Sequence, residues 1–271
     1  MNKRHVLVII FGAVFLYMLI KPLTEQDKYA AIASKKGQQD PSITKKIIEQ
    51  PLHDVVLPKF GEIRDIKQKK KKFFNFLRPA IVKENSRISQ VRQQVEVINS
   101  KLQENQSLTD EDKSLITSLV KQYKIKKAPT LQSKVNKLLA KVDIVPTPLV
   151  LVQAANESAW GTSRFARIGL NFFGIWCFKE GCGMVPNGRD EGLRHEVAAF
   201  ESVEKAVKHY LHNINTNQAY HVFRTIRAQL HEQSQPLTAE MLATGLLPYS
   251  ERGTDYVIEI SEMIRHNKKY F

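Results

Sequence analysis

An apolar run that leaves no polar helix face, closed by a single acid, constrains the fold of this chain more than any other stretch. Thr147 and Pro148 predict the start of a helix, with a side-chain cap and a proline at the first helical position, and Gly161 predicts its end. A helix without a polar face must be enclosed by protein on all sides. We therefore expect a buried central helix that contains Leu149, Val150, Leu151, Val152, Ala154 and Ala155.

Glu157 and Ser158 lie at the far end of this predicted helix. A carboxyl group in apolar surroundings loses hydration, which disfavours the charged form and raises its pKa toward neutrality. A carboxyl group of this kind can hold a proton and donate it as a general acid. The alternative is a structural carboxylate that pairs with Arg164 or Arg167 at the helix end.

Three blocks in this stretch carry a resemblance to a known family. They are Glu-Ser-Ala-Trp-Gly at 157–161, Ser-Arg-Phe-Ala at 163–166 and Asn-Phe-Phe-Gly-Ile-Trp at 171–176. In this order they resemble the glucosaminidase family of bacterial cell-wall hydrolases, glycoside hydrolase family 73. The layout of the whole chain resembles the bacterial Bax-type proteins, which carry this domain at their C-terminal end.

The resemblance implies a fold and a set of site residues. The fold would be mainly α, a lysozyme-like α+β domain with a helical core and a small β-hairpin lobe. Glu157 would be the general acid, and Trp160, Phe173 and Trp176 would form a wall on which sugars stack, although large aromatic residues at such spacings also build cores. Substrate-binding residues would then be Ser158, Trp160, Asn171, Phe173 and Trp176.

A second catalytic group is expected in a β-hairpin formed by residues 172–178 and 196–200, which flank a polar loop. Cleavage of a glycosidic bond requires a proton donor and a group that stabilises or attacks the positive sugar centre. Asp190, Glu191 and Glu196 are candidates, and the resemblance favours Glu191. The N-acetyl group of the substrate is the alternative nucleophile.

Tyr249 is a further catalytic candidate, because residues 247–250 and 254–256 resemble a tyrosine-containing block of the same family. The Tyr249 hydroxyl would hydrogen-bond the N-acetyl group or orient a water molecule. The alternative is a tyrosine that closes the core.

Cys177 and Cys182, the only two cysteines, lie inside the predicted hairpin. In an oxidising compartment they can form a local disulfide. Their spacing excludes a Cys-x-x-Cys redox pair, and a metal site would need two further ligands that the sequence does not supply. His209 and His212 share a helix face but lack a third ligand, so we expect no metal and no cofactor.

Positive charge is concentrated in the first half of the chain. Residues 1–147 carry 28 Lys and Arg against 14 Asp and Glu, whereas residues 148–271 carry 13 of each. This distribution favours an anionic surface near the site of action, such as phospholipid headgroups or acidic wall polymer. Nucleic acid is not the expected partner, since no helix-turn-helix pattern, zinc-ligand spacing or RNA-binding aromatic motif accompanies the charge.

The first 22 residues predict a signal peptide or membrane anchor, because Asn2, Lys3 and Arg4 precede the apolar run 6–20. We expect an uncleaved anchor in preference to a removed signal. Either form would place the rest of the chain in the bacterial cell envelope, on the periplasmic side of the inner membrane or free in the periplasm.

Residues 23–72 are predicted as a polar, basic tether and residues 73–271 as the glucosaminidase-like domain, with a catalytic core over 130–271. Apolar residues at helical spacing predict helices over 81–102, 109–123 and 130–142 that pack around the buried helix. Further helices are expected over 203–214, 220–230 and 254–266.

Together these features predict an exported hydrolase that cleaves β-1,4 glycosidic bonds of peptidoglycan, with glycan strands as its partner and an endo-β-N-acetylglucosaminidase activity. One alternative is a lytic transglycosylase or muramidase that uses the same Glu157, since residues 157–161 also satisfy the Glu-Ser-x-x-Gly pattern of those enzymes. Another is a wall-binding protein without turnover. The chain lacks a nucleotide-binding glycine loop, a Gly-x-Ser-x-Gly elbow and a metalloprotease motif.

Overall fold

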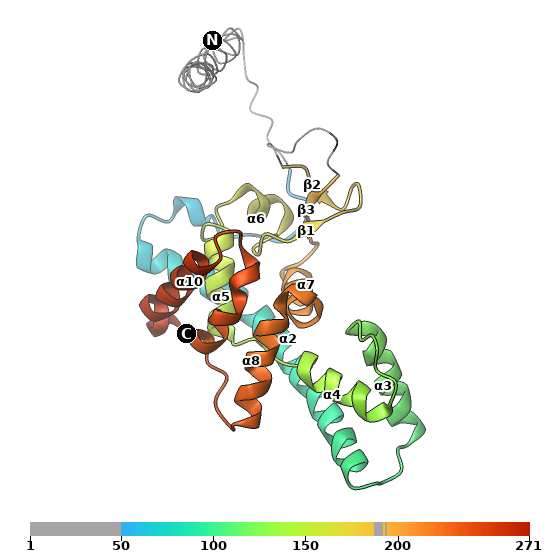
Figure 1. Ribbon diagram of the computed structural model, residues 1–271. Helices are drawn as coiled ribbons and strands as arrows, with labels where there is room; N and C mark the ends of the chain where they lie inside the picture. The colour runs from blue at the N-terminus through green and yellow to red at the C-terminus, as the bar shows by residue number, and fades with distance from the viewer. Residues whose placement is uncertain (1–49, 187–191, 193) are drawn as a thin grey trace, which may run out of the picture. The chain divides into compact units, whose positions relative to one another are not determined.

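Helix α5 (Thr147–Glu157) lies at the centre of the computed structural model, which describes residues 50–186, 192 and 194–271 (Figure 1). Its apolar residues and Gln153 are fully buried, as the absence of a polar face predicts. The helix packs against α2 (Ile66–Gln103), α9 (Ala239–Ala243) and α10 (Thr254–Asn267). Its N-cap is Pro146, without a side-chain bond, so Thr147 is the first helical residue and the predicted Thr147 cap is wrong by one position.

Helix α2 is 38 residues long and runs through Pro79, so that the helix predicted over 81–102 continues into the lysine-rich stretch before this proline. Pro79 lacks the N–H that would bind the carbonyl four residues earlier, which weakens the helix locally. Phe73, Phe74 and Leu77, in the two turns before the proline, are completely buried, and Ile81, just after it, is buried as well, so both sides of Pro79 are held against the core. Burial of these large side chains therefore overrides the helix-breaking tendency of Pro79.

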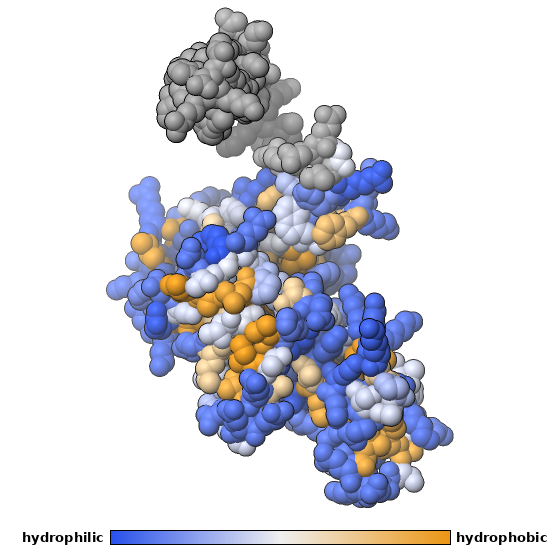
Figure 2. Space-filling view, in the orientation of Figure 1, coloured by the Kyte–Doolittle hydropathy of each residue, from blue (hydrophilic) through white to orange (hydrophobic). Residues whose placement is uncertain are grey.

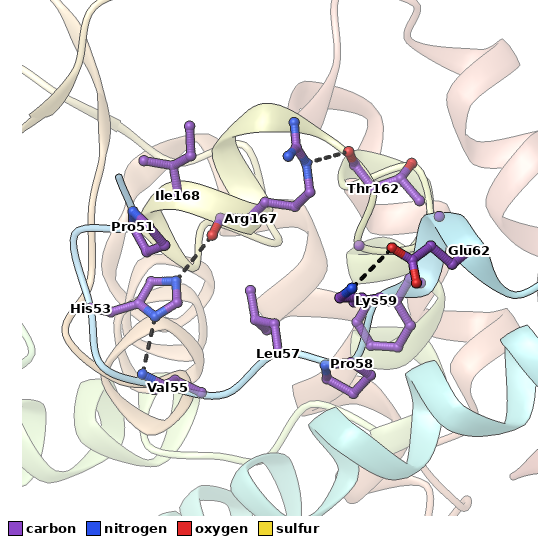
Figure 3. Close-up of a pocket in the computed structure, with 13 residues that line it drawn as sticks. Pro51, His53, Val55, Leu57, Pro58, Lys59, Glu62, Thr162, Arg167 and Ile168 are labelled. Carbon is purple, nitrogen blue, oxygen red and sulfur yellow. Dashed lines mark hydrogen bonds and ion pairs between the residues drawn. The ribbon is translucent and has the colours of Figure 1, made fainter. Parts of the chain in front are cut away.

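The described segment before α2, residues 50–65, is part of the same folded unit as the helices that follow it. Leu52 N donates a hydrogen bond to Ile168 O at 2.8 Å, and His53 Nε2 bonds Arg167 O at 3.1 Å (Figure 3). Phe60, in the short helix η1 (Phe60–Glu62), is buried. The predicted tether is therefore wrong for residues 50–72, while residues 1–49, which include the predicted anchor, lie outside the described part of the chain.

Helices α3 (Asp110–Gln122) and α4 (Leu131–Lys141) pack against each other, and α4 also packs on α2. Both begin with a capping box, formed by Thr109 with Asp112 and by Thr130 with Ser133. Each box satisfies backbone N–H groups that the first helical turn leaves without partners. None of the described helices is both long enough and apolar enough to cross a membrane.

Short helix α6 (Arg164–Gly169) leads into a small antiparallel sheet of β1 (Trp176–Cys177), β2 (Gly183–Met184) and β3 (Glu196–Ala198). The strand order is β1-β3-β2, and Val197 pairs with Trp176 on one side and with Met184 on the other. The predicted hairpin pairing of β1 with β3 is present, but the strands are shorter than expected and the sequence did not reveal β2.

The C-terminal part is helical and packs around α5 (Figure 1). This mainly α fold with one small sheet confirms the expected fold class. Besides α9 and α10, its elements are α7 (Val203–Thr216), η2 (Gln218–Tyr220), α8 (His221–Glu232), η3 (Thr244–Tyr249) and η4 (Lys268–Tyr270).

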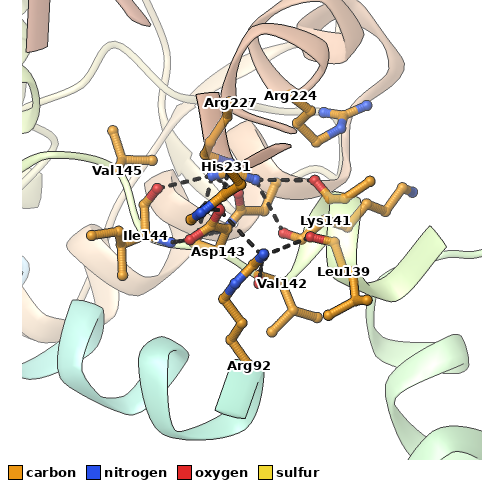
Figure 4. Close-up of polar contacts among 12 residues, drawn as sticks. Arg92, Leu139, Lys141, Val142, Asp143, Ile144, Val145, Arg224, Arg227 and His231 are labelled. Atoms are coloured by element: carbon orange, nitrogen blue, oxygen red, sulfur yellow. Dashed lines mark hydrogen bonds and ion pairs between the residues drawn. The ribbon is translucent and has the colours of Figure 1, made fainter. Parts of the chain in front are cut away.

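A buried charged cluster joins α2, α8 and the connection between α4 and α5 (Figure 4). Asp143 Oδ2 lies 3.3 Å from Arg227 Nε, 3.2 Å from Arg92 Nη1 and 2.6 Å from His231 Nε2. Arg227 also donates to the carbonyls of Asp143 and Ile144. Burial lowers the pKa of Arg227 to about 10, against the opposing effect of Asp143. The cluster thus holds the segment that enters α5 against α2 and α8.

Candidate active site

Glu157 lies at the C-terminal end of α5 and lines a pocket of about 370 Å³. Helices α5 and α7, the turn before β1, η2 and η3 each supply part of the wall. The other lining residues are Phe173, Gly174, Ile175, Trp176, Phe178, His209, Asn213, Asn217, Tyr220 and Tyr249. The predicted acid therefore sits in a hollow made by elements that are distant in sequence.

Burial raises the pKa of the Glu157 carboxyl group above its usual value. Hydrogen bonds from Tyr256 and Asn156, together with the charge of Arg252, act in the opposite direction but do not cancel the loss of hydration. Within the described residues Glu157 forms no ion pair with Arg164 or Arg167, the structural alternative considered from sequence. Arg167 Nε instead donates to Thr162 O.

A chain of buried hydrogen bonds leads to Glu157 from behind the pocket. The Tyr210 hydroxyl donates to Gln153 Oε1, and Gln153 Nε2 donates to the Tyr256 hydroxyl oxygen at 2.9 Å. Because the Tyr256 oxygen already accepts a bond from Gln153, its own proton is directed to Glu157. Gln153 lies one turn before Glu157 on α5, so a single helix carries both the acid and the group that orients its hydrogen-bond donor.

Tyr249 lines the pocket, and its hydroxyl donates to Phe173 O at 2.7 Å. Its ring stacks on Tyr256 with the ring centres 5.5 Å apart. Because the Tyr249 hydroxyl proton is donated to Phe173 O, the Tyr249 oxygen can only accept hydrogen bonds from other groups. It can therefore receive a hydrogen bond from an N-acetyl N–H or a water molecule, provided the bond to Phe173 is kept.

Gly174 brings backbone unusually close to the acid. Its φ is +64°, and a Cβ at this position would lie 3.4 Å from Glu157 Oε2. Glycine adopts this left-handed conformation without strain, whereas a side chain would both strain the turn and narrow the space at the carboxyl group. Sequence reasoning treated Gly174 only as part of a motif, and its position beside the acid is a finding of the structure.

The predicted stacking wall is only partly assembled. Trp176 is 48% exposed and lines the pocket. Phe173 is 1% exposed, with its ring stacked on Tyr210 at 4.2 Å. Trp160 packs on Phe73 and Phe74 and does not line the pocket. The prediction that these three rings form one wall is therefore wrong, because two of the rings serve the core.

Ser158 and Asn171 are buried structural residues and do not contact the pocket, contrary to the prediction that they bind substrate. The Ser158 hydroxyl donates to Ala154 O and accepts from Gly161 N, which ends α5. Asn171 Nδ2 donates to Ile175 O and Ala198 O, both at 2.8 Å, and its Oδ1 accepts from two backbone N–H groups. Asn171 thus shapes the turn that carries Phe173 and Gly174.

Among the candidates for a second acid, only Glu196 lies within the described residues. It is buried, and its two oxygens accept hydrogen bonds from Gly181 N at 3.0 Å and Gly183 N at 2.9 Å. Glu196 therefore holds the loop between β1 and β2 and does not line the pocket. Asp190 and Glu191 lie outside the described residues.

Cys177 and Cys182 form a disulfide that closes the same loop. Their sulfur atoms lie near the Glu196 carboxylate in an arrangement that could resemble a metal site. Sulfur atoms bonded to each other are not thiolate ligands, so the group is a structural staple. The disulfide holds the base of the segment that presents Trp176 and Phe178 to the pocket.

Several lining residues were not identified from the sequence. Phe178, which is 81% exposed, extends the aromatic rim beside Trp176. His209, Asn213, Asn217 and Tyr220 come from α7 and η2. The available signal was the spacing of His209 and Asn213, which lie one helical turn apart beside the buried stripe of α7, but which polar residues border a pocket depends on tertiary packing.

A half-buried acid that lines a pocket at the end of a central helix, in a mainly α domain, is the arrangement expected of a glycosidase. Residues 132–269 match the Glucosaminidase family, described as mannosyl-glycoprotein endo-beta-N-acetylglucosaminidase. The chain belongs to this family of glycosidases.

A curated relative extends this similarity beyond the domain. The chain is 35% identical to Protein bax of Escherichia coli (strain K12) over 202 residues, which are 74% of this chain and 70% of that protein. No solved structure matches the chain.

Proposed function

We propose that this protein hydrolyses β-1,4 glycosidic bonds of peptidoglycan beside N-acetylglucosamine, with Glu157 as the general acid. One observation carries the proposal: the Glu157 carboxyl group lines a pocket while burial raises its pKa. Membership of the glucosaminidase family supports the same substrate class.

In the proposed reaction Glu157 gives its proton to the glycosidic oxygen as the bond from the sugar carbon to that oxygen breaks. Water then supplies the hydroxyl group on the sugar carbon, and its remaining proton returns to Glu157. The Gln153–Tyr256 hydrogen bonds keep the carboxyl group oriented toward the pocket. Tyr249 accepts a hydrogen bond from the substrate N-acetyl group or from water.

The group that stabilises the positive sugar centre is proposed to be Glu191, with the substrate N-acetyl group as the alternative. Removal of a catalytic carboxylate typically slows a glycosidase by about 100-fold or more. If Glu191 acts directly, Glu191→Ala will show such a loss and added azide will restore part of the rate. If the N-acetyl group acts, Glu191→Ala will be little affected and azide will have no effect.

The test of the main proposal is Glu157→Gln, which keeps the shape of the side chain but cannot donate a carboxyl proton. Release of soluble fragments from purified cell wall should fall by about 100-fold or more. Glu232→Gln, an exposed change of the same type on α8, is the control and should digest wall at the parent rate. Equal fragment release by Glu157→Gln and the parent would remove this mechanism and favour a wall-binding protein.

Mass spectrometry of the parent digest identifies the bond that is cut. Hydrolysis beside N-acetylglucosamine leaves reducing N-acetylglucosamine ends. Reducing muramic ends would indicate a muramidase, and anhydro-muramic ends a lytic transglycosylase that uses the same acid.

We also propose that residues 1–22 export the chain and anchor it in the envelope, on the basis of the basic start and apolar run in the sequence. Fractionation of cells that express the full chain tests this. Recovery in the membrane fraction, with the C-terminal domain open to protease only after the outer barrier is permeabilised, is the expected result. Recovery in the cytoplasmic fraction would contradict it.

A further inference from the structure

A second hollow, of about 530 Å³, is lined by an unusual number of lysines. Lys124 and Lys126 come from the turn that follows α3, and Lys137 and Lys141 come from α4. The opposite wall is neutral and consists of residues from the end of α7 and the start of η2. We call this hollow the lysine pocket. Figure 2 shows a largely hydrophilic surface where α7 approaches α3 and α4.

The lysine pocket and the Glu157 pocket share a wall. Asn213 and Asn217 line both hollows, and Asn217 Nδ2 donates to Asn213 Oδ1 at 3.2 Å. The positive charge also acts across this wall, because the charge of Lys124, after the larger effect of burial, lowers the pKa of His209, which lines the Glu157 pocket. A ligand in one hollow is therefore adjacent to the other.

The charge of the lysine pocket is not compensated by carboxylates. Within the part of the chain that the structure describes, none of its four lysines forms an ion pair. Lys137 and Lys141 direct their ammonium groups to backbone carbonyls, at Lys127 and Tyr123 among others. Lys124 and Lys126 are exposed, and within the described residues their ammonium groups make no hydrogen bond to protein.

The positive charges of these lysines also repel one another. Burial first, and then the charges of Arg224, Lys124 and Lys137, lower the pKa of Lys141. Like charges held close together without a counter-charge raise the free energy of the folded protein, and an anionic ligand relieves this repulsion. Lysine offers a compact charge on a flexible stem, which suits anionic groups of varied geometry.

We infer that the lysine pocket binds carboxylate groups of the peptides attached to the glycan strand whose sugars occupy the Glu157 pocket. This inference rests on the proposed function. Since the sugar backbone of the strand offers no free carboxylates where peptides are attached, the anionic groups of that polymer are carried by its peptides. The shared wall of Asn213 and Asn217 places the cations where a substituent of the bound strand extends from the catalytic hollow.

The experiment compares two substrates: glycan strands that carry their peptides, and strands from which an amidase has removed them. The variant is Lys124→Gln with Lys126→Gln, chosen because these side chains are exposed and make no structural hydrogen bond. Glutamine is also unbranched at Cβ, which matters because Lys124 has a φ of +51°. The matched control is Lys67→Gln with Lys71→Gln, which removes two charges from the exposed start of α2.

The parent should show a higher kcat/KM on peptide-bearing strands than on peptide-free strands. In the double variant the ratio of these two values should fall by about fivefold, as expected for the loss of two exposed charge pairs, and mainly through KM. The ratio should be unchanged in the control. Salt should reduce the parent's preference, because screening weakens exposed charge interactions.

An unchanged ratio in the double variant would overturn the inference. Loss of binding to vesicles of anionic phospholipid, with the peptide preference retained, would also overturn it and identify a lipid headgroup as the ligand. If the parent cleaves neither substrate, the proposed function itself fails. If the parent cleaves both substrates with equal kcat/KM, the proposed function stands and only the inference about the lysine pocket is overturned.

Discussion

Glu157 is placed where its charged form is disfavoured, and this placement has a consequence for stability. Because burial raises the pKa of Glu157 in the folded state above its usual value of 4.5, its contribution to folding is fully present below that value. The contribution is lost as the pH rises through the raised pKa. The acid thus makes the folded protein less stable at the pH where an enzyme of this kind works.

Replacing Glu157 with Gln should therefore raise the melting temperature at neutral and alkaline pH. The difference between variant and parent should grow as the pH is raised from 4 to 8, because only the parent has to ionise a buried group. Thermal unfolding at a series of pH values measures this. A difference that does not change with pH would show that the carboxyl group is not desolvated.

Tyr256 is expected to set the alkaline limit of activity. Its hydrogen bond to the Glu157 carboxylate stabilises the charged form and so lowers the pKa of the acid. Tyr256→Phe removes the bond, the pKa of Glu157 rises further, and the acid keeps its proton to a higher pH. The alkaline limb of the kcat/KM profile should move upward in pH.

A change that only loosened the core would reduce kcat/KM without moving this limb. Tyr220→Phe, which changes another tyrosine of the pocket that does not bond Glu157, is the control and should leave the position of the limb unchanged.

At the residue scale, sequence was informative about chemistry and less so about contacts. The apolar helix predicted the buried surroundings of Glu157, whereas the family resemblance was needed to favour a general acid over a structural ion pair. Ser158 and Asn171 were assigned to substrate from the same motif, but they bond backbone groups. A short motif contains both pocket-lining and structural residues. Which of the two a residue is depends on whether its side chain points into the pocket or toward the backbone, and the sequence does not give that direction.

At the scale of elements, the turn between α6 and β1 supplies Phe173, Gly174 and Ile175 to the lining of the Glu157 pocket, more residues than any single helix supplies. Asn171 makes four hydrogen bonds that determine the path of Phe173, Gly174 and Ile175. A turn of this kind has no periodic sequence pattern, so its shape could not be predicted, although its position after α6 could.

Asn171→Ala should destabilise the protein by about 3 kcal/mol, because buried carbonyl and N–H groups lose their partners. Urea unfolding measures this change. Asn136→Ala, which removes an exposed asparagine from α4, should cost less than about 0.5 kcal/mol. Equal stability of the two variants would mean that the turn does not depend on the Asn171 side chain.

Gly174→Ala tests the same turn from the side of the pocket. The new Cβ would lie 3.4 Å from Glu157 Oε2, in a backbone conformation that alanine adopts with about 1 kcal/mol of strain. We expect a lower kcat/KM with the domain still folded, measured on purified wall. Gly192→Ala, which also has positive φ but meets no atom within 4 Å, is the matched control and should retain the parent kcat/KM.

The continuity of α2 through Pro79 was not predicted at the same scale, for a different reason. By local rules Pro79 disfavours a continuous helix. This tendency is outweighed by the packing of Phe74 against Trp160 and the C-terminal residues Tyr270 and Phe271. A contact between segments about 190 residues apart leaves no local signature.

For the whole molecule, the residues that match the family and the residues that form the folded unit are not the same. The match begins at residue 132, inside α4, whereas the folded unit also includes α2, which packs against α4, α5 and α7. The sequence-based catalytic core, 130–271, omits α2 in the same way. The fold class was predictable from the family resemblance together with the helical spacing of apolar residues, but the boundary was not, because α2 contributes through packing alone.

A chain trimmed to residues 132–271 should therefore fail to fold, whereas one trimmed to 50–271 should fold cooperatively. Loss of α2 exposes the face of α5 that it covers and leaves the backbone of Val145 without its bonds to Asn85. Circular dichroism and thermal unfolding of both chains measure this. A cooperative transition in the shorter chain would show that α2 is dispensable.

The two tryptophans of this chain occupy contrasting surroundings, and this gives the protein an optical reporter of its own. Trp160 is packed between Phe73 and Phe74 with Lys70 over its ring, whereas Trp176 stands at the rim of the Glu157 pocket. After Trp160→Phe, all indole emission comes from the pocket rim. Titration with wall fragments should then shift that emission toward the blue as sugar displaces water from the ring, so occupancy can be followed by fluorescence without labelling either partner.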